Sequence, residues 1–163
     1  MRARDGVTGP VVFLDIDGVL NDGGWWRLQK DKIRGPREDE ATWRSMINPE
    51  GVARLNRITA ATGARLVVSS SWRGPHNFER LCRILHDSGV AAPILGVTPH
   101  MAYRDREILQ YVMREGVTAW IAIDDMSLPE LRPEHVVMTS WDGGLLDEHV
   151  ERAIALLERQ SRK

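Results

Sequence analysis

The chain has 163 residues, of which 42% are hydrophobic and 28% are charged, with a formal net charge of −1. These values are typical of a globular protein with one full core, and we expect a single domain spanning residues 1–163. The small net charge gives no overall attraction to nucleic acid, so any such affinity has to come from a local patch.

Two further absences bear on where the protein works. No apolar stretch approaches the roughly 20 residues of a membrane helix, and the first ten residues lack the apolar segment of a secretory signal. Cys82 has no second cysteine with which to form an intramolecular disulfide, which is consistent with a reducing compartment. We therefore expect a cytoplasmic protein.

The first predicted element is a strand that ends in acidic residues. Four apolar residues, Val11 to Leu14, run directly into Asp15 and Asp17, and Gly18 follows. The apolar run predicts a buried parallel strand, and the glycine allows a sharp turn at its carboxyl end. Two carboxylates there suit a hard cation such as Mg²⁺, although aspartates that only cap a turn give the same pattern.

The next segment, residues 21–47, is polar, and we expect an irregular flap. Its aromatic residues Trp25, Trp26 and Trp43 stand among basic ones, which are Arg27, Lys30, Lys32, Arg34, Arg37 and Arg44. Aromatic rings interleaved with cations suit a groove for single-stranded nucleic acid. The alternative is that the tryptophans pack the flap onto the domain while the charges are solvated.

The rest of the chain alternates between helices and strands. The expected elements are a helix over 49–62 capped by Asn48, a strand over 65–69, a helix near 77–88, a strand over 94–97, a helix near 103–115, a strand over 118–123, a strand over 135–138 and a helix near 147–159. Such alternation predicts an α/β fold with a mainly parallel central sheet and helices on both faces.

Polar groups follow three of these strands. They are Asp15 with Asp17, the run Ser69 to Ser71, and the pair Asp124 and Asp125. Because the carboxyl ends of parallel strands share one edge of the sheet, we expect these groups to converge there. Adjacent acids repel each other unless a cation lies between them, so the pattern predicts a Mg²⁺ site.

A basic residue is expected to complete the site if the ligand is a phosphate. Arg104 begins the helix that precedes Asp124, where a cation adds to the favourable helix N-terminus. With these residues in place, the chain resembles the haloacid dehalogenase (HAD) superfamily of phosphohydrolases. The four motifs that carry the resemblance are Asp15-Ile16-Asp17-Gly18-Val19, the serines of Ser69-Ser70-Ser71-Trp72-Arg73, Arg104, and Asp124-Asp125.

The resemblance extends roughly from Val11 to Leu157. More narrowly, SSSWR, RxxEI (Arg104 to Ile108), IDD and a later T…GL stretch (Thr139, Gly144-Leu145) are similar to the HAD domains of Swiss army knife RNA-repair proteins. The resemblance implies a Rossmann-like HAD fold. Too few residues separate the motifs for a full cap domain, which implies an open site.

The resemblance also implies roles for individual residues. Asp15 is the expected nucleophile, and Asp17 is the expected general acid and then general base. Mg²⁺ is expected at Asp15, at the backbone carbonyl of Asp17, and at the Asp124–Asp125 pair, with Asp125 favoured as the direct ligand. Further residues are expected to contact the phosphoryl group or the rest of the substrate, namely Ser70 and Arg104 at the phosphoryl oxygens, and Ser71, Arg73, Trp25 and Trp26 at the substrate.

Some of these assignments have alternatives. Ser69 or Ser71 can take the place of Ser70, and Arg106 can take the place of Arg104. Trp72 either lines the entrance or belongs to the core. The five histidines show no metal-ligand spacing.

The function expected from these residues is Mg²⁺-dependent hydrolysis of phosphate monoesters through an aspartyl-phosphate. An open site favours a large substrate such as a DNA or RNA end, and the resemblance implies separately encoded repair proteins as partners. The alternatives are a small-molecule, nucleotide-type phosphatase and a non-catalytic module that binds phosphate ends. The non-catalytic module is disfavoured because a module that only binds phosphate ends does not need both Asp15 and Asp17.

Overall fold

The computed structural model describes residues 7–32 and 39–163. The strands are β1 (Val11–Leu14), β2 (Arg65–Val68), β3 (Ile94–Val97), β4 (Trp120–Asp124) and β5 (Val136–Met138). The α-helices are α1 (Gly23–Gln29), α2 (Glu40–Ser45), α3 (Pro49–Thr62), α4 (Phe78–Asp87), α5 (Arg104–Glu115) and α6 (Asp147–Ser161). Two 3₁₀ turns, η1 (Ser71–Arg73) and η2 (Pro133–His135), complete the elements of the described chain.

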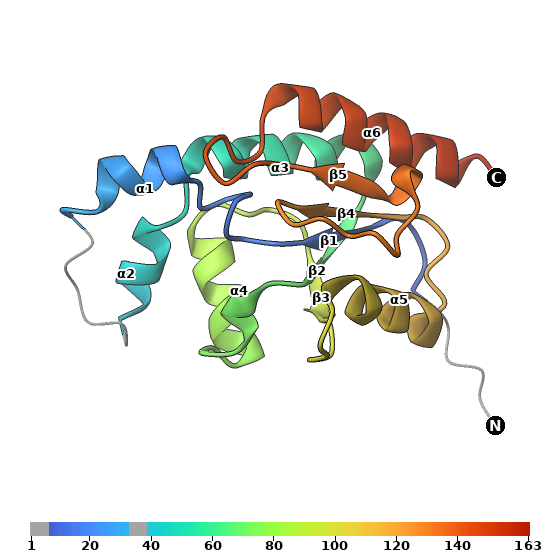
Figure 1. Cartoon of the computed structure of the whole chain (residues 1–163), viewed down its shortest axis with the longest axis horizontal. Helices are drawn as coiled ribbons and strands as arrows, with labels where there is room; N and C mark the ends of the chain where they lie inside the picture. Colours follow the sequence, from blue (N-terminus) through green and yellow to red (C-terminus); the bar gives the residue numbers. More distant parts are fainter. Residues whose placement is uncertain (1–6, 33–38) are drawn as a thin grey trace.

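The five strands form one parallel sheet in the order β3-β2-β1-β4-β5 (Figure 1). The most apolar strand, β1, lies at its centre, and Leu14 is paired with Val68 of β2 on one side and with Ile123 of β4 on the other. The chain leaves β1 toward β2 and β3 and later crosses back to β4. This reversal of direction beside β1 is the place where open α/β sheets bind ligands.

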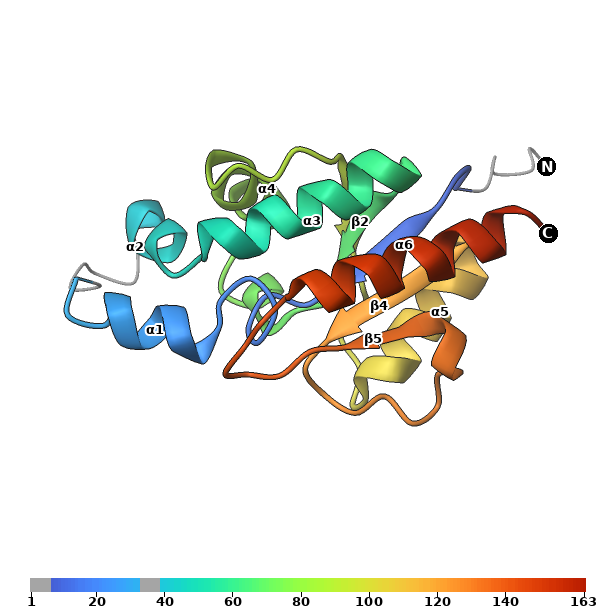
Figure 2. The same ribbon diagram turned by 90° about the horizontal axis from the view of Figure 1, so that it is seen from above.

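Helices cover both faces of the sheet, so the α/β prediction with a Rossmann-like HAD fold is confirmed. The larger apolar cluster joins Val12 and Leu14 to α3, α4 and α6, and α3 and α6 lie side by side in Figure 2. The smaller cluster joins Val11 and Phe13 to α5 on the opposite face. Strand residues alternate between the two faces, and both faces are apolar, which explains the unbroken hydrophobic run of β1.

The helix capped by Asn48 begins and ends as predicted. The Asn48 side chain accepts a hydrogen bond from the Glu50 N–H, Pro49 takes the first helical position, and Gly63 ends the helix in the left-handed conformation at φ 69°. These three residues are the start and stop signals of a helix. Among the described residues, no helix is long and apolar enough to cross a bilayer.

The expectation of an irregular segment over residues 21–47 is wrong for most of its described part. Helix α1 forms because the Asp22 side chain caps it at the N–H of Trp25, at 2.8 Å, and α2 forms because Asp39 caps it at Ala41. Both helices project beyond the carboxyl edge of the sheet in Figure 1. Arg34 and Arg37, which we expected in this segment, lie outside the described residues.

Candidate active site

Three carboxylates meet where β1 and β4 end. Because Leu14 is paired with Ile123, the next residues of the two strands, Asp15 and Asp124, emerge side by side. Asp125 joins them, and each residue offers one oxygen that lies within 4.8 Å of those of the other two. The convergence of strand ends predicted from the sequence therefore brings these three acids together.

The environment of the cluster disfavours three negative charges. Burial and then the neighbouring Asp124 carboxylate raise the pKa of Asp15 to about 8. Burial is also the main cause that raises the pKa of Asp124 and that of Asp125. Carboxyl groups held this close and this deep need either protons or a cation. Oxygen ligands of this kind are those that Mg²⁺ prefers, so the residues present fit that ion.

Arg104 is the basic group that reaches the cluster. As the first residue of α5, it extends its guanidinium to the carboxyl edge, where Nη1 lies 2.8 Å from Asp124 Oδ2 and 3.5 Å from Asp15 Oδ1. Arg106, the alternative from the sequence, instead pairs with Glu130 at the surface, at 3.0 Å. The structure thus brings Arg104, and not Arg106, to the acids.

Glu107 forms an ion pair with Arg104. Its Oε2 lies 3.5 Å from Arg104 Nε and 2.6 Å from Arg73 Nη2, and its Oε1 accepts the N–H of Met101 at 2.9 Å. Arg73 also donates to the backbone oxygen and the hydroxyl of Thr98. The side chains of Glu107 and Arg73 are both buried and form an ion pair, so the guanidinium of Arg73, which we expected to contact substrate, is engaged within the protein.

Asp17 does not belong to the group of three acids, although its negative charge is one of the causes that raise the pKa of Asp125. Its Oδ1 accepts hydrogen bonds from Asn21 Nδ2 at 2.7 Å and from Trp72 Nε1 at 3.0 Å. Trp72 is buried and contacts two further rings, those of Trp43 from α2 and His76, with centroids 4.8 and 6.2 Å away. Of the two alternatives for Trp72, the core position is the one observed, with its indole N–H directed at Asp17.

The three serines after β2 have different surroundings. Ser69 follows Val68 and is therefore level with Asp15, and its buried Oγ finds no hydrogen-bond partner among the described residues. The Ser70 side chain caps η1 by accepting the N–H of Trp72 at 3.3 Å. Ser71 is exposed. Ser69 is thus the buried serine of the run whose hydroxyl has no hydrogen-bond partner in the described part of the chain.

The turn between Asp15 and α1 is shaped by Gly18. This residue has φ 79°, and a Cβ there would lie 2.3 Å from Asp125 Cγ, so only glycine allows the turn to pass this close to the acids. The hydroxyl of Thr139, just after β5, donates to the Gly18 carbonyl at 2.7 Å. The Leu145 N–H donates to the Val19 carbonyl at 3.0 Å, so the segment after β5 fixes the turn.

The flap residues are mostly engaged within the protein. Trp25 donates its indole N–H to the Ser45 carbonyl at 3.0 Å, which ties α1 to α2. Trp26 is partly exposed, and Arg27 pairs with Asp142 at 3.1 Å. For Trp25 and Trp43, the observed positions agree with the alternative in which the tryptophans pack the flap onto the domain.

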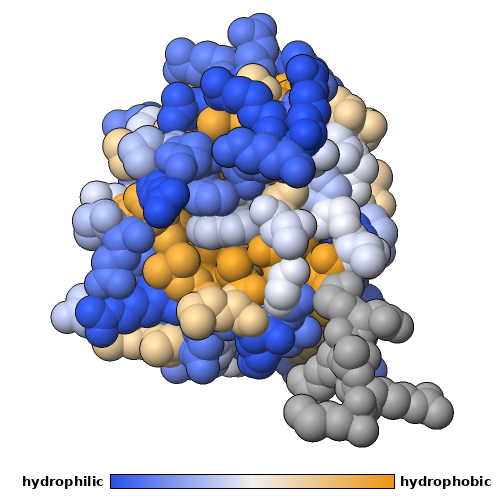
Figure 3. Space-filling view, turned by 90° about the vertical axis from the view of Figure 1, so that its right-hand side faces the viewer, coloured by the Kyte–Doolittle hydropathy of each residue, from blue (hydrophilic) through white to orange (hydrophobic). Residues whose placement is uncertain are grey.

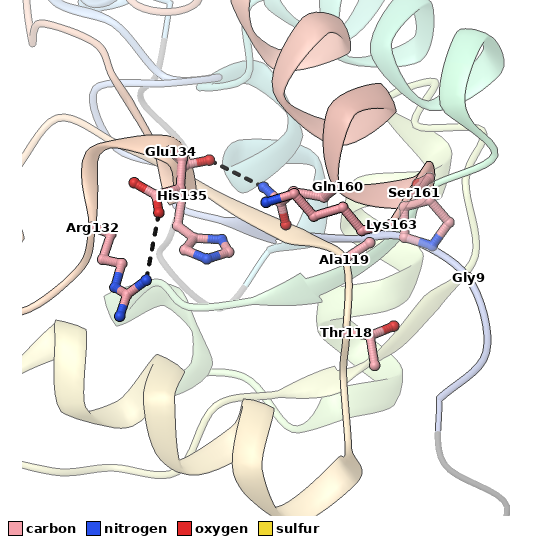
Figure 4. Close-up of a pocket in the computed structure, with 10 residues that line it drawn as sticks. Gly9, Thr118, Ala119, Arg132, Glu134, His135, Gln160, Ser161 and Lys163 are labelled. Carbon is pink, nitrogen blue, oxygen red and sulfur yellow. Dashed lines mark hydrogen bonds and ion pairs between the residues drawn. The ribbon is translucent and has the colours of Figure 1, made fainter.

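A separate cavity of about 640 Å³ lies at the opposite, amino-terminal edge of the sheet. Its lining includes Glu134, whose carboxylate faces Arg132 at 3.8 Å and whose carbonyl accepts from Gln160 at 3.0 Å (Figure 4). Seen from that end, the surface is apolar at its centre (Figure 3). The cavity lacks the clustered carboxylates of the other edge and is far from Asp15 along β1.

Three site residues were given no role from the sequence, namely Asn21, Glu107 and Thr139, although Glu107 lies in the RxxEI motif and Thr139 in the T…GL stretch. A signal existed for two of them. Asn21 stands four residues after Asp17, and Glu107 stands one helical turn after Arg104, a spacing at which helical side chains meet. Thr139 belonged to the T…GL stretch, but its contact with Gly18 depends on tertiary packing.

Comparison with known families agrees with the geometry of this site. The family model described as "HAD domain in Swiss Army Knife RNA repair proteins" matches residues 11–150, which include all the strands and the acids at their ends. No curated protein and no solved structure matches the chain significantly. The match spans most of the sequence, and the chain therefore belongs to the family of HAD domains found in Swiss Army Knife RNA repair proteins.

Proposed function

We propose that this protein is a Mg²⁺-dependent phosphatase that hydrolyses phosphate monoesters through an aspartyl-phosphate on Asp15. The observation that carries the proposal is the buried cluster of Asp15, Asp124 and Asp125 with Arg104 beside it. A carboxylate nucleophile next to a cation site and a phosphate-binding guanidinium is an arrangement suited to phosphoryl transfer. The family match to RNA-repair HAD domains supports it.

Mg²⁺ would be held by the side chains of Asp15 and Asp125, with Asp124 as a further ligand, and by the backbone carbonyl of Asp17. When bound, the ion supplies positive charge that neutralises the phosphoryl oxygens. It also relieves the repulsion between the buried acids, whose raised pKa values oppose full ionisation.

The protein's own groups carry the two chemical steps. In the first, an Asp15 carboxylate oxygen bonds to phosphorus while the bond from phosphorus to the ester oxygen breaks, and Asp17 donates a proton to that leaving oxygen. In the second, Asp17 takes a proton from water as the water oxygen attacks phosphorus and the bond to Asp15 breaks. Asp17 thus ends protonated again, ready for the next turnover.

Arg104 and a serine of the run after β2 would bind the phosphoryl oxygens, where charge spreads in the transition state. Among the serines, Ser69 fits this role best because its hydroxyl is level with Asp15 and unpartnered within the described chain. Arg73 would act indirectly, since its ion pair with Glu107 fixes the carboxylate that contacts Arg104.

We infer that the chain forms one domain and that residues 21–47 act as a flap over an open site. In the part that the structure describes, only α1, α2 and α3 lie between β1 and β2, which is too little for a separate cap domain. An open site suits a bulky phosphate ester, and the family match favours a nucleic-acid end. Trp26 on α1, which is partly exposed, is a candidate for contact with such a substrate.

The test is phosphate release in the presence of Mg²⁺ from a 3′-phosphorylated oligonucleotide, a 5′-phosphorylated one, free nucleotides and an aryl phosphate. We expect turnover that requires Mg²⁺, prefers one oligonucleotide end and disappears in Asp15→Asn. Preference for free nucleotides would overturn the nucleic-acid end as substrate and favour the small-molecule alternative. Undiminished turnover in Asp15→Asn would overturn the aspartyl-phosphate.

A further inference from the structure

A pocket of about 580 Å³ opens beside the acidic cluster, between the start of α5 and the loop that follows β4. Its lining includes Tyr103, Arg104, Arg106, Met126, Leu128 and Pro129. Arg104 belongs both to this pocket and to the group that contacts Asp15 and Asp124. The pocket and the acidic cluster therefore share Arg104, and Met126 of the pocket follows Asp125 directly in the chain.

Tyr103 is the aromatic residue that lines the pocket. The residue precedes α5 and caps it only through its backbone, since its carbonyl accepts the Glu107 N–H at 3.1 Å while its side chain makes no capping bond. The guanidinium of Arg106 lies over the ring, 5.3 Å from its centroid. The residue nevertheless remains 61% exposed, which leaves ring surface available for a second planar group.

The charges around the pocket largely cancel. Arg106 pairs with Glu130 at 3.0 Å, and buried Asp105 accepts the backbone N–H groups of Arg106 and Glu130 at 2.9 and 3.2 Å. Arg104 is already directed at the acids of the cluster. A ligand group in this pocket therefore meets an aromatic ring and apolar side chains with little net charge, which suits a neutral, flat group and not a second anion.

Met126 connects the pocket to the acids from the other side. It follows Asp125 directly, its N–H donates to Asp124 Oδ1 at 2.9 Å, and its flexible thioether side chain is about half exposed. Methionine sulfur makes favourable contacts with aromatic rings and adapts to their shape. Tyr103 and Met126 both line this pocket, so an aromatic ring and a flexible thioether are available there to a planar group.

We propose that this pocket binds the base of the nucleotide whose phosphate is cleaved, with Tyr103 stacking on the base and Met126 packing against it. This inference rests on the proposed phosphatase function, because it takes Asp15 and Arg104 as the place of the phosphate. Stacking does not depend on which base is present, since every base has a π face. The pocket would therefore distinguish a base-bearing end from an abasic one, and not one sequence from another.

The experiment compares two oligonucleotides that carry the same terminal phosphate and differ only in whether the terminal nucleotide has a base. Binding is measured by fluorescence anisotropy and turnover by phosphate release, for the wild type and for Tyr103→Ala, Tyr103→Phe and Phe78→Ala. Phe78 is an exposed aromatic residue at the start of α4, outside the pocket, and serves as the matched control.

We expect the wild type to bind the base-bearing end about tenfold more tightly than the abasic end, and Tyr103→Ala to abolish this difference by weakening only the base-bearing end. Tyr103→Phe keeps the ring and should keep the preference, as should Phe78→Ala. A wild type that binds both ends equally, or a Tyr103→Ala variant that weakens both ends equally, would overturn the inference.

The binding arm separates this inference from the proposed function. If no ester, including an aryl phosphate, releases phosphate, the phosphatase proposal fails, while the comparison of base-bearing and abasic ends still decides whether Tyr103 binds a base. If phosphate is released from both ends with the same KM in all variants, the phosphatase proposal stands and the base pocket is wrong.

Discussion

The indole Nε1 of Trp72 donates a hydrogen bond to Asp17 Oδ1 at 3.0 Å, and it does so from a buried position. Asn21 Nδ2 donates to the same oxygen at 2.7 Å. Because both donors are directed at Oδ1, Oδ2 remains the oxygen on which a transferable proton can reside. Trp72 and Asn21 would thus orient the general acid without contacting substrate.

Replacing Trp72 by Phe tests this orientation, because the change keeps an aromatic ring against Trp43 and removes the N–H. We expect kcat for an alkyl phosphate monoester to fall about tenfold, since its leaving oxygen needs a well-placed proton. The fall should be much smaller for an aryl phosphate, whose leaving group departs without one. An equal fall for both esters would mean that Trp72 acts only on the fold, which a thermal melt would report independently.

The serine run gives a second prediction. Ser69→Ala should lower kcat/KM about 100-fold, as the loss of one donor to a developing oxyanion does in other enzymes. It should leave the melting temperature nearly unchanged, because the Ser69 Oγ has no partner in the described chain to lose.

Ser70→Ala is the matched variant, since it removes the cap of η1 and should cost about 1 kcal/mol of unfolding free energy with a smaller loss of activity. The two variants are compared by steady-state kinetics and by denaturant unfolding. If Ser70→Ala loses the greater activity, the phosphate-binding serine is the one expected from the sequence and not Ser69.

The raised pKa of Asp15 predicts a pH-dependent stability of the protein in the presence of a chelator. Between its ordinary value of 3.8 and about 8, Asp15 is protonated in the folded chain and ionised in the unfolded chain. The folded state then binds more protons, so stability falls as the pH rises through this window. Asp15→Asn cannot ionise, and at pH 8 it should melt about 5 °C above the wild type.

Mg²⁺ should reverse this difference. The ion binds the ionised carboxylates, so its affinity rises with pH, and at pH 8 it should raise the melting temperature of the wild type more than that of Asp15→Asn. Scanning calorimetry at several pH values with and without Mg²⁺ measures both effects. A wild type whose stability in chelator rises from pH 5 to pH 8 relative to Asp15→Asn would contradict the assignment.

The buried ion pair behind the site predicts a large difference between two similar substitutions. Arg73→Met leaves the buried Glu107 carboxylate without its shortest partner, and it should cost about 3 kcal/mol of unfolding free energy. Arg106→Met breaks an exposed pair with Glu130 and should cost well under about 1 kcal/mol. Urea unfolding of the two variants measures the difference, and equal costs would show that the Arg73 pair is no stronger than a surface one.

The sequence predicted the sheet and the convergence of its acids because both follow from local patterns. The apolar run of Val11–Leu14 requires two covered faces, and parallel strands that end in acids must present them at one edge. The pairing of Asp17 with Trp72 was not predictable in the same way, because it joins residues 55 positions apart through the packing of η1.

The described helices of the flap were missed for a related reason. Each is only six or seven residues long, and short helices have little periodicity to detect. Their caps, Asp22 and Asp39, were present in the sequence but stood among charged residues that also suit a loop. Arg73 was likewise expected to contact substrate, because its distance along the chain from Glu107 hides their pairing, which depends on how η1 meets α5.

The turn after Asp15 is held by hydrogen bonds from Thr139 and Leu145, which are made more than a hundred residues later in the chain. During synthesis on the ribosome, Asp15 therefore emerges long before the residues that fix its surroundings and before Asp124 and Asp125. A nascent or truncated chain that ends before β4 would carry Asp15 without Asp124 and Asp125, and one that ends before β5 would still lack the hydrogen bonds that fix the turn. The protein would acquire its chemistry only near the end of translation, so incomplete copies would be unable to attack phosphate esters in the cell.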